Sequence, residues 1–344
     1  MKLAVGFIAY NEHSSQYLPY FLPSLFQALS LVGGESRVWC IDNSDQRANQ
    51  NWEYIEKEYH WIQYHFSGAN IGFAKAYNQI MAAASAWGAD YFLMINPDTF
   101  LDPQSLKLML AAISSGRLGS VSPRLLHWNF KQEILTDIID SDGIALDARH
   151  HFWDKHQGQK SFSFNPGYIF GATGAAALFN MSALEDVAFL DEFGQKEYLD
   201  EMFFMYKEDI DLAYRLQLAG WSAWLEPRAK VYHDRSASAA GNKCLKIWRA
   251  YWSKSRKVKG WSFYGQALIY KKYLFLPYTG KIRFLSWLYY QKRVVFTALF
   301  SPYLLKELKR LKRERHYITW RQESLKVKIP LKNLEKMMFD GIEQ

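Results

Sequence analysis

Cysteine is scarce in this sequence of 344 residues. Its two cysteines, Cys40 and Cys244, are far apart and form no pattern of metal ligands or disulfides. This excludes a small disulfide-stapled scaffold and gives no sign of a cysteine-bound metal. Cys40 lies in an apolar run and is predicted to be a buried thiol, which is typical of a protein from a reducing cytoplasm.

Long apolar runs are missing beyond Ser238. The longest uncharged stretch there, from Val294 to Leu305, has 12 residues, whereas a helix needs about 20 apolar residues to cross a bilayer. At the other end, Met1 and Lys2 are followed at once by an apolar run that lacks the length and the cleavage site of a signal peptide. The sequence therefore predicts no transmembrane helix and no secretory leader.

Acidic residues are scarce in the last third of the chain. Residues 241–344 contain 24 Lys and Arg against 6 Asp and Glu, whereas residues 1–240 contain 18 basic and 28 acidic residues. The tail, at +18, is therefore expected to meet an anionic partner. A membrane surface is favoured because basic and aromatic residues alternate at helical spacing. The alternatives are a solvated basic face and nucleic acid, for which the chain has no recognisable module.

Apolar runs alternate with helical patterns through the first hundred residues, in a chain that is 49% hydrophobic and 17% aromatic. Strands are predicted over 3–9, 38–41, 61–65, 91–95, 221–225 and 229–233, and helices over 19–31 and 74–87. This alternation indicates an α/β domain with a mostly parallel sheet over residues 1–240. The basic residues 241–344 are predicted to form a second, helical region.

Polar side chains follow several of these strands, at the sheet edge where α/β proteins bind ligands. Asp98 comes after Pro97, and a carboxylate there suits a Mg²⁺ or Mn²⁺ ion that holds a diphosphate. His233 ends a strand and could add an imidazole, which favours Mn²⁺, although a histidine at a strand end is more often structural. Asp42 is placed to accept a hydrogen bond from a pyrimidine ring.

Three acids, Glu208, Asp209 and Asp211, open a helical pattern. Such acids are also ordinary in the first turn of a helix, where the dipole favours them. Beside a bound diphosphate, however, Asp209 would act as a general base for an acceptor hydroxyl. Glu208 would then raise the basicity of Asp209 by repulsion or bind the acceptor itself.

Two further stretches are less regular. The segment from Asp137 to Gln159 is expected to form loops and short strands, and whether it closes over a substrate stays open. The small residues from Phe170 to Ala177 allow close backbone approach, either to a neighbouring strand or to a ligand.

Taken in order, these motifs resemble the family-2 glycosyltransferases of the GT-A fold, in particular the bacterial rhamnosyltransferase-like branch. The resemblance covers about residues 3–240 and implies a mostly parallel mixed sheet with flanking helices, followed here by a basic helical extension. The motifs that carry it are Ile41-Asp42-Asn43-Ser44, Gly68 to Asn78, Asn96-Pro97-Asp98, Leu199 to Asp211, and Val231-Tyr232-His233.

The resemblance also implies roles for individual residues. Asp98 and His233 would bind Mg²⁺ or Mn²⁺, although Asn96 replaces the first acid of the family motif and leaves one anionic ligand fewer. Glu208 and Asp209 match the paired acids, with Asp209 at the position of the base. The positions where the family binds the nucleotide and diphosphate are Ala9, Tyr10, Asn11, Asp42, Asn70, Gly72, Asn78 and Asn96.

The activity implied is that of a metal-dependent, inverting hexosyltransferase in cell-surface polysaccharide (O-antigen or cell-wall) synthesis. It would move rhamnose from dTDP-rhamnose to a glycan or polyprenyl-diphosphate-linked acceptor at the inner face of the plasma membrane, without nucleic acid. The alternatives are a UDP-sugar donor (galactofuranose, N-acetylglucosamine or glucose) and a non-catalytic nucleotide-sugar-binding protein. Assembly into a homo-oligomer is left open.

Overall fold

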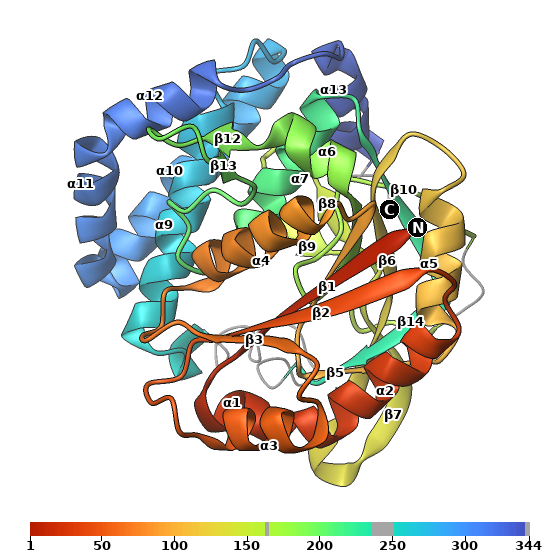
Figure 1. Cartoon of the computed structure of the whole chain (residues 1–344). Helices are drawn as coiled ribbons and strands as arrows, with labels where there is room; N and C mark the ends of the chain where they lie inside the picture. Colours follow the sequence, from red (N-terminus) through yellow and green to blue (C-terminus); the bar gives the residue numbers. More distant parts are fainter. Residues whose placement is uncertain (162–164, 236–250, 341–344) are drawn as a thin grey trace.

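A mixed β-sheet forms the centre of the computed structural model, which describes residues 1–161, 165–235 and 251–340. Within these residues the sheet has ten strands in the order β10-β14-β6-β11-β4-β1-β2-β3, with β5 beside β14 and β7 beside β6 (Figure 1). The strands are β1 (Lys2–Ala9), β2 (Glu35–Asp42), β3 (Gln63–Phe66), β4 (Tyr91–Ile95), β5 (Thr99–Leu101), β6 (Leu118–Asn129), β7 (Ile134–Ser141), β10 (Gly167–Ile169), β11 (Ala176–Asn180) and β14 (Ser222–His233). Two small hairpins lie outside it, β8 (Ile144–Leu146) with β9 (Phe152–Asp154), and β12 (Phe189–Leu190) with β13 (Lys196–Glu197).

The first four predicted strands form the parallel half of the sheet, β3-β2-β1-β4. Because β1 and β2 are parallel and pair Ala9 with Asp42, the ends of both strands meet at one edge. The prediction differs at β14, where the two expected strands are one, interrupted by a register shift between Glu226 and Lys230. The α/β sheet with flanking helices is otherwise confirmed.

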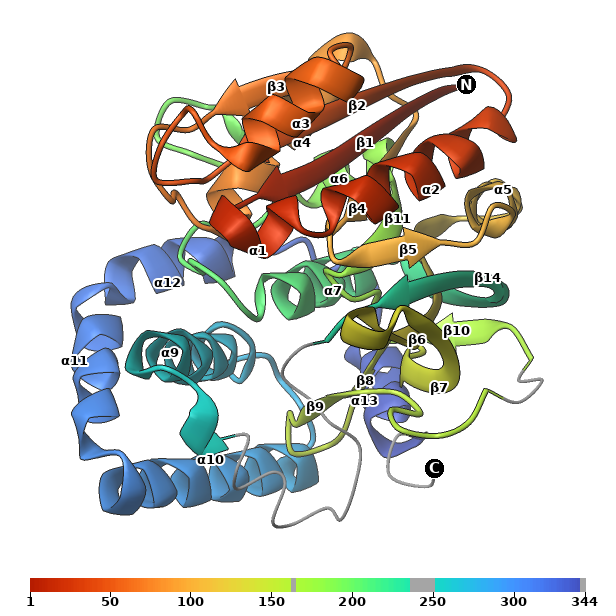
Figure 2. The same ribbon diagram turned by 90° about the horizontal axis from the view of Figure 1, so that it is seen from below.

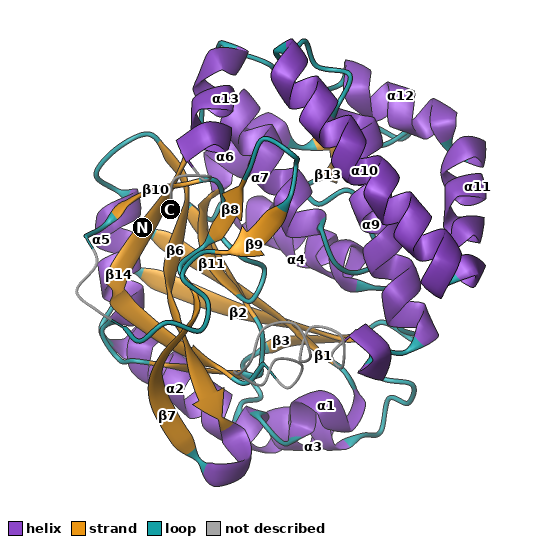
Figure 3. Cartoon of the chain, turned by 180° about the vertical axis from the view of Figure 1, so that it is seen from behind, coloured by secondary structure: helices purple, strands orange, loops and turns teal. Residues whose placement is uncertain are grey.

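Helices cover both faces of the sheet (Figure 3). Alternation along β1 explains this, because Leu3 and Phe7 pack in one core with residues of α2, α3 and α5, whereas Ala4 packs in a second core with α4, α6 and α7. A short helix, α1, follows β1. The helices are α1 (Asn11–Ser15), α2 (Leu18–Ser30), α3 (Gln50–Glu58), α4 (Phe73–Trp87), α5 (Ser105–Ile113), α6 (Met181–Val187) and α7 (Glu208–Leu218), with a 3-10 turn η1 (Phe130–Gln132).

The irregular middle of the sequence has more strand than was predicted. The 12-residue β6 runs through it, and the segment from Asp137 to Gln159 contains the end of β7 and the β8–β9 hairpin. The small-residue run packs closely, because a Cβ added to Gly171 would lie 2.4 Å from the Cβ of Ala213 on α7.

The C-terminal helices gather beside α7 (Figure 2). Tyr264 and Tyr273 are buried in one core with Tyr214 of α7 and Phe152 of β9. The predicted boundary at residue 240 and Cys244 lie outside the described residues, whereas Cys40 is buried as predicted. These elements are α9 (Arg256–Tyr273), α10 (Gly280–Phe300), η2 (Pro302–Leu305), α11 (Lys306–Arg313), α12 (Arg315–Glu323) and α13 (Leu331–Asp340). Over the described part of the chain, none of the helices combines the length and apolarity needed to cross a bilayer.

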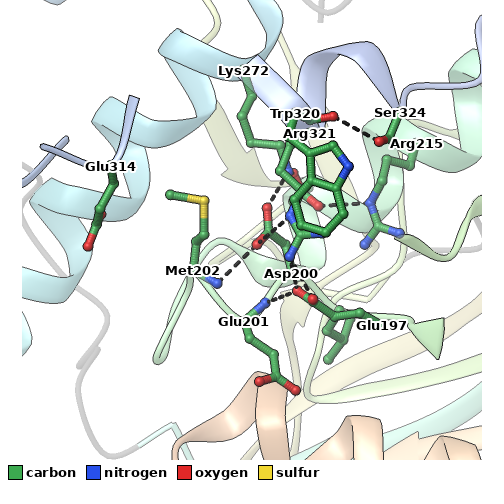
Figure 4. Close-up of polar contacts among 12 residues, drawn as sticks. Glu197, Asp200, Glu201, Met202, Arg215, Lys272, Glu314, Trp320, Arg321 and Ser324 are labelled. Carbon is green, nitrogen blue, oxygen red and sulfur yellow. Dashed lines mark hydrogen bonds and ion pairs between the residues drawn. The ribbon is translucent and has the colours of Figure 1, made fainter. Parts of the chain in front are cut away.

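Buried ion pairs join these helices to the sheet domain (Figure 4). Lys272 of α9 is fully buried and bonds both Asp211 of α7 and Asp200, the latter at 2.5 Å between Nζ and Oδ2. Arg321 of α12 bonds Glu197, with 2.6 Å between Nη2 and Oε2. We call this set, with Arg215, the anchor cluster: Glu197, Asp200, Asp211, Arg215, Lys272 and Arg321. The basic tail is therefore packed into the fold at these points.

Candidate functional site

Strand pairing brings Asp98 and His233 together. β5 and β14 are antiparallel and pair Thr99 with His233, and the backbone N–H of Asp234 donates to the carbonyl oxygen of Asp98 at 3.0 Å. The Oδ2 of Asp98 consequently lies 3.5 Å from the Nε2 of His233. The other carboxylate oxygen of Asp98, Oδ1, is buried and has no hydrogen-bond partner among the residues that the structure describes.

His233 lies between two carboxylates. Its Nδ1 is 2.8 Å from Oδ2 of Asp140, and Asp140 is also paired with Arg235, which in turn pairs with Asp154. Burial lowers the pKa of His233, but the carboxylates of Asp98 and Asp140 outweigh it and raise this pKa to about 10. The local potential therefore strongly favours positive charge. We call Asp98, Asp140, Asp154, His233 and Arg235 the histidine cluster.

The acidic motif is held in a strained turn at the start of α7. Tyr206 and Lys207 have φ values of 72° and 82°, a left-handed conformation that is costly for residues other than glycine. Gly265 of α9 lies against this turn, since a Cβ there would be 2.9 Å from the carbonyl oxygen of Tyr206. A C-terminal helix thus supports the turn that carries Glu208 and Asp209.

A single turn before β11 connects Asp209 with the Asp98 motif. The backbone N–H of Gly174 donates to Oδ2 of Asp209 at 3.3 Å, and the carbonyl oxygen of the next residue, Ala175, accepts from the backbone N–H of Asn96 at 2.9 Å. The Asp98 motif and Asp209, more than a hundred residues apart in sequence, are therefore both bonded to this turn, which lies beside the end of β4. Gly174 belongs to the small-residue run, which contacts the acidic motif as well as packing internally.

Burial controls the ionisation of the paired acids. It is the largest cause of the raised pKa of Glu208, and the charge of Asp209 adds to it. Burial also raises the pKa of Asp209, against the charge of Lys207, which lowers it. Burial is the largest cause of the raised pKa of Asp209. Whether Glu208 raises the basicity of Asp209 by repulsion or binds the acceptor stays a prediction. Asp209 is half-buried, while Oε2 of Glu208 is buried and has no hydrogen-bond partner in the described part of the chain.

Several residues predicted to bind the nucleotide lie in the loop after β1, which is hydrogen-bonded to the loop after β2. The carbonyl oxygen of Ala9 accepts from the backbone N–H of Asn43, and the side chain of Asn11, at φ 44°, exchanges two hydrogen bonds with Asp45. Tyr10, between them, donates its backbone N–H to Ser14. A direct contact of these residues with a nucleotide stays a prediction.

Asp42 is fully buried, and internal donors engage both of its carboxylate oxygens. Oδ1 accepts from the backbone of Ser44, and Oδ2 accepts from Asn49 and from the hydroxyl of Tyr64 at 2.6 Å. The position of Asp42 at the strand end agrees with the prediction, but its carboxylate holds the 43–49 loop in place. Its contact with a pyrimidine stays a prediction.

The glycine-rich turn packs against the acidic segment. Gly72 has φ 87°, and a Cβ there would lie 2.7 Å from the carbonyl oxygen of Phe204. The side chain of Asn70 caps this turn by accepting from the N–H of Gly72. Asn78 lies where the nucleotide is predicted to bind. Its side-chain N–H group donates to the carbonyl oxygen of Leu199 and to the carboxylate of Glu201, and its side-chain oxygen accepts from the backbone N–H of Leu199. Asn78 therefore helps to hold in place the segment that leads from Leu199 to the paired acids.

A match to a family profile shows which protein family this chain belongs to. The profile described as Glycosyl transferase family group 2 matches residues 91–317, more than half of the chain. The chain belongs to this glycosyltransferase family. The match includes both Asp98 and the paired acids, and the resemblance proposed from the motifs is confirmed.

Other glycosyltransferases share parts of the sequence or the fold. The N-acetylglucosaminyl-diphospho-decaprenol L-rhamnosyltransferase of Mycobacterium tuberculosis is 28% identical over 193 residues, which cover 50% of this chain and 58% of that protein. The chain thus spans little more than half the length of the curated relatives it matches.

Two solved structures support the GT-A fold, each with a TM-score of 0.51 and 12% identity. One is GalNAc-T7 with UDP, GalNAc and Mn²⁺, covering 88% of this chain and 58% of that chain. The other is S. aureus TarS 1-349 in complex with UDP-GlcNAc, covering 98% of this chain and 90% of that chain.

The residues of this glycosyltransferase fit a divalent cation at Asp98. One buried oxygen of Asp98 has no partner among the described residues, and the Nε2 of His233 faces the same carboxylate. No set of three or more His, Cys, Asp or Glu side chains forms a metal cage among the described residues. An ion here would therefore depend on ligands such as water or a diphosphate to complete its shell, as Mg²⁺ commonly does.

Two cavities lie elsewhere in the structure. One, of about 470 Å³, lies among the C-terminal helices, and the other, of about 240 Å³, lies beside Tyr168; neither is lined by Asp98 or Asp209.

Several residues of the site escaped the sequence analysis: Lys207, Gly174, Asp140, Arg235 and Asp154. Lys207 stands directly before the paired acids, and Arg235 two residues after His233, so proximity to a motif was a usable signal for both. Gly174 lies in the small-residue run, whose possible approach to a ligand was the signal for it. Asp140 and Asp154 come from the irregular Asp137–Gln159 stretch, where no motif marks them.

Proposed function

We propose that this glycosyltransferase transfers a sugar, by inverting displacement, from a nucleoside diphosphate to an acceptor hydroxyl, with Asp209 as the base. The Gly174–Ala175 turn, which bonds both Asp209 and the Asp98 motif, is the observation that carries the proposal. Asp209 takes the hydroxyl proton, the freed oxygen bonds the anomeric carbon, and the bond from that carbon to the diphosphate oxygen breaks. The nucleoside diphosphate leaves.

Asp98 and His233 are the residues proposed to hold Mg²⁺ or Mn²⁺. When bound, the ion supplies positive charge against the departing diphosphate. The unpartnered oxygen of Asp98 and the position of the His233 Nε2, 3.5 Å from the other oxygen of Asp98, support this role. The structures of GalNAc-T7 with Mn²⁺ share only the fold with this chain.

Rhamnose from dTDP-rhamnose is the proposed donor sugar, and a polyprenyl-diphosphate-linked glycan is the proposed acceptor. The support is the mycobacterial relative, which is named as a rhamnosyltransferase acting on a diphospho-decaprenol-linked sugar. Such a substrate would place the enzyme in cell-surface polysaccharide synthesis, at the inner face of the plasma membrane.

Helix α10 is the proposed contact with that membrane. Several of its apolar side chains are exposed, including Trp287 at 52% and Leu299 at 71% exposure. The helix has four basic residues and no acidic one. Exposed aromatic and aliphatic side chains flanked by Lys and Arg suit an anionic lipid surface. The exposed apolar side chains of α10 are Phe284, Trp287, Val295, Phe296, Leu299 and Phe300.

A donor screen tests the function. The full chain is incubated with Mn²⁺ or Mg²⁺, a polyprenyl-diphosphate-linked GlcNAc acceptor and, one at a time, dTDP-rhamnose, UDP-galactofuranose, UDP-GlcNAc and UDP-glucose. Mass spectrometry then measures released nucleotide and glycosylated lipid, with the Asp209→Asn variant as the control for contaminating hydrolases.

We expect product from dTDP-rhamnose. Product from a UDP-sugar alone would replace the donor and keep the mechanism. Nucleotide binding without any turnover would make the chain a non-catalytic nucleotide-sugar-binding protein.

A further inference from the structure

A buried carboxylate stands directly behind the histidine of the proposed metal site. Asp140, near the end of β7, is 4% exposed, and its Oδ2 lies 2.8 Å from Nδ1 of His233. The two residues are 93 positions apart in sequence. Asp140 lies in the irregular Asp137–Gln159 stretch, to which the sequence analysis gave no chemical role.

The contact decides which nitrogen of the imidazole faces Asp98. An ionised carboxylate can only accept a hydrogen bond, so Nδ1 of His233 must be the donor toward Asp140. The remaining nitrogen, Nε2, is the one that lies 3.5 Å from Oδ2 of Asp98. A neutral imidazole that keeps its proton on Nδ1 has its lone pair on Nε2, on the side where the Asp98 carboxylate would hold a cation.

Asp140 is itself held in position on its other oxygen. Its Oδ1 accepts from Nη1 of Arg235 at 3.2 Å and from Nε2 of Gln157 at 3.4 Å. The same guanidinium nitrogen of Arg235 bonds Asp154 of β9 at 2.7 Å. A carboxylate bonded at both oxygens cannot rotate freely, so it fixes the plane of the imidazole as well as its protonated nitrogen.

From this geometry we propose that Asp140 is a positioning residue that orients His233 and directs its Nε2 to a divalent cation on Asp98. The inference rests on the proposed function, because it takes Asp98 and His233 as the metal ligands. A carboxylate behind a ligating histidine typically contributes about 10- to 100-fold to metal affinity.

A purely structural ion pair would behave differently. If Asp140 served only to neutralise Arg235 and His233 in the interior, its removal would lower stability and leave the metal affinity of the folded protein unchanged. Metal binding measured directly on folded protein therefore separates the two roles without any activity assay.

The experiment titrates Mn²⁺ into the full chain in the presence of dTDP and follows free Mn²⁺ by electron paramagnetic resonance. It compares the native chain with Asp140→Ala and Asp140→Asn, and each variant is first shown by circular dichroism to be folded. The matched control is Asp142→Asn. Asp142 is equally buried and pairs with an arginine and a histidine, Arg124 and His156, instead of His233.

We expect Asp140→Ala to bind Mn²⁺ about 10- to 100-fold more weakly than the native chain, and Asp142→Asn to bind within about threefold of it. Asp140→Asn keeps one acceptor oxygen and should fall between, which keeps the test usable if the alanine variant fails to fold. Native affinity in folded Asp140→Ala, or in folded Asp140→Asn where only that variant folds, would overturn the inference and leave the proposed function standing. Absence of Mn²⁺ binding in the native chain itself would instead overturn the metal site, and the inference with it.

Discussion

The proposed site and the anchor cluster both contain buried acids, but their carboxylates differ in how fully they are bonded. In the anchor cluster every carboxylate oxygen of Glu197, Asp200 and Asp211 accepts a hydrogen bond. In the proposed site, Oδ1 of Asp98 and Oε2 of Glu208 are buried and have none.

An unbonded buried oxygen is costly, so a fold keeps one where a ligand can supply the missing partner. The comparison separates Asp98 and Glu208, which each keep an unbonded oxygen, from the fully bonded acids of the anchor cluster. Asp209 is bonded at both oxygens, but by the backbone N–H groups of Gly174 and Ile210 instead of buried cations. Mutations should therefore tell the two groups apart. Changes in the proposed site should lower activity, whereas changes in the anchor cluster should lower stability.

The largest effect is expected at Asp209. Asp209→Asn removes the proposed base and should lower kcat by about 10²- to 10⁴-fold, with thermal stability unchanged or raised because a partly desolvated charge is lost. Released nucleotide measures the rate, and thermal shift with dTDP measures donor binding, which should persist. Asp211→Asn, in the same helix, should do the reverse and lower stability, because it leaves Lys272 and Arg215 short of a partner. Turnover retained in Asp209→Asn would refute the base assignment.

The next largest effect is expected on stability, and two adjacent lysines of α9 test it. Lys272→Met leaves Asp200 and Asp211 buried without their shared cation and should lower the free energy of unfolding by about 3–5 kcal/mol. Lys271 is exposed, and Lys271→Met should change it by less than about 0.5 kcal/mol. Urea denaturation followed by circular dichroism provides both values. Equal stability in the two variants would show that the anchor cluster does not join the helices to the domain.

The pH dependence of stability should have opposite signs in the two groups. The pKa of Glu208 is raised by burial and by Asp209, so the folded state binds this proton more tightly than the unfolded chain, and stability should fall as pH rises above the ordinary glutamate range. Burial raises the pKa of Asp211, but Lys272 and Arg215 outweigh it and lower it, so its contribution is present at neutral pH and lost on acidification. Melting temperatures measured between about pH 4 and 9 should fall on the alkaline side for the native chain. This fall should disappear in Glu208→Gln. A decline unchanged in that variant would mean that Glu208 does not cause it.

Residues next to apolar runs could be predicted from the sequence. Asp98 and His233 end strands, and Asp209 opens a helix, so the alternation of strand and helix was enough to place them at one edge of the sheet. Family resemblance added their roles. The parallel half of the sheet followed from the same alternation.

Residues that depend on long-range pairing could not be predicted. Asp140 reaches His233 through the pairing of β6 with β7, which includes register shifts that no periodicity reveals. Asn78 bonds Leu199, 121 residues away. Lys272 looked like one cation among many in a basic tail, and only the fold shows which of them meets buried acids.

The smallest effect is expected on the outer side of the C-terminal helices, where α10 exposes apolar side chains such as Trp287 to solvent. Trp287→Ser should weaken binding to phosphatidylglycerol vesicles by roughly fivefold, since about 1 kcal/mol of apolar contact is lost. Trp61 gives a matched control, because it is equally exposed, at 52%, but lies beside β3 in the sheet domain. Sedimentation with vesicles of phosphatidylglycerol and phosphatidylcholine, repeated at rising salt, measures both variants. Equal losses, or none, would mean that α10 is not the membrane contact, and that the basic tail serves the fold through its buried cations alone.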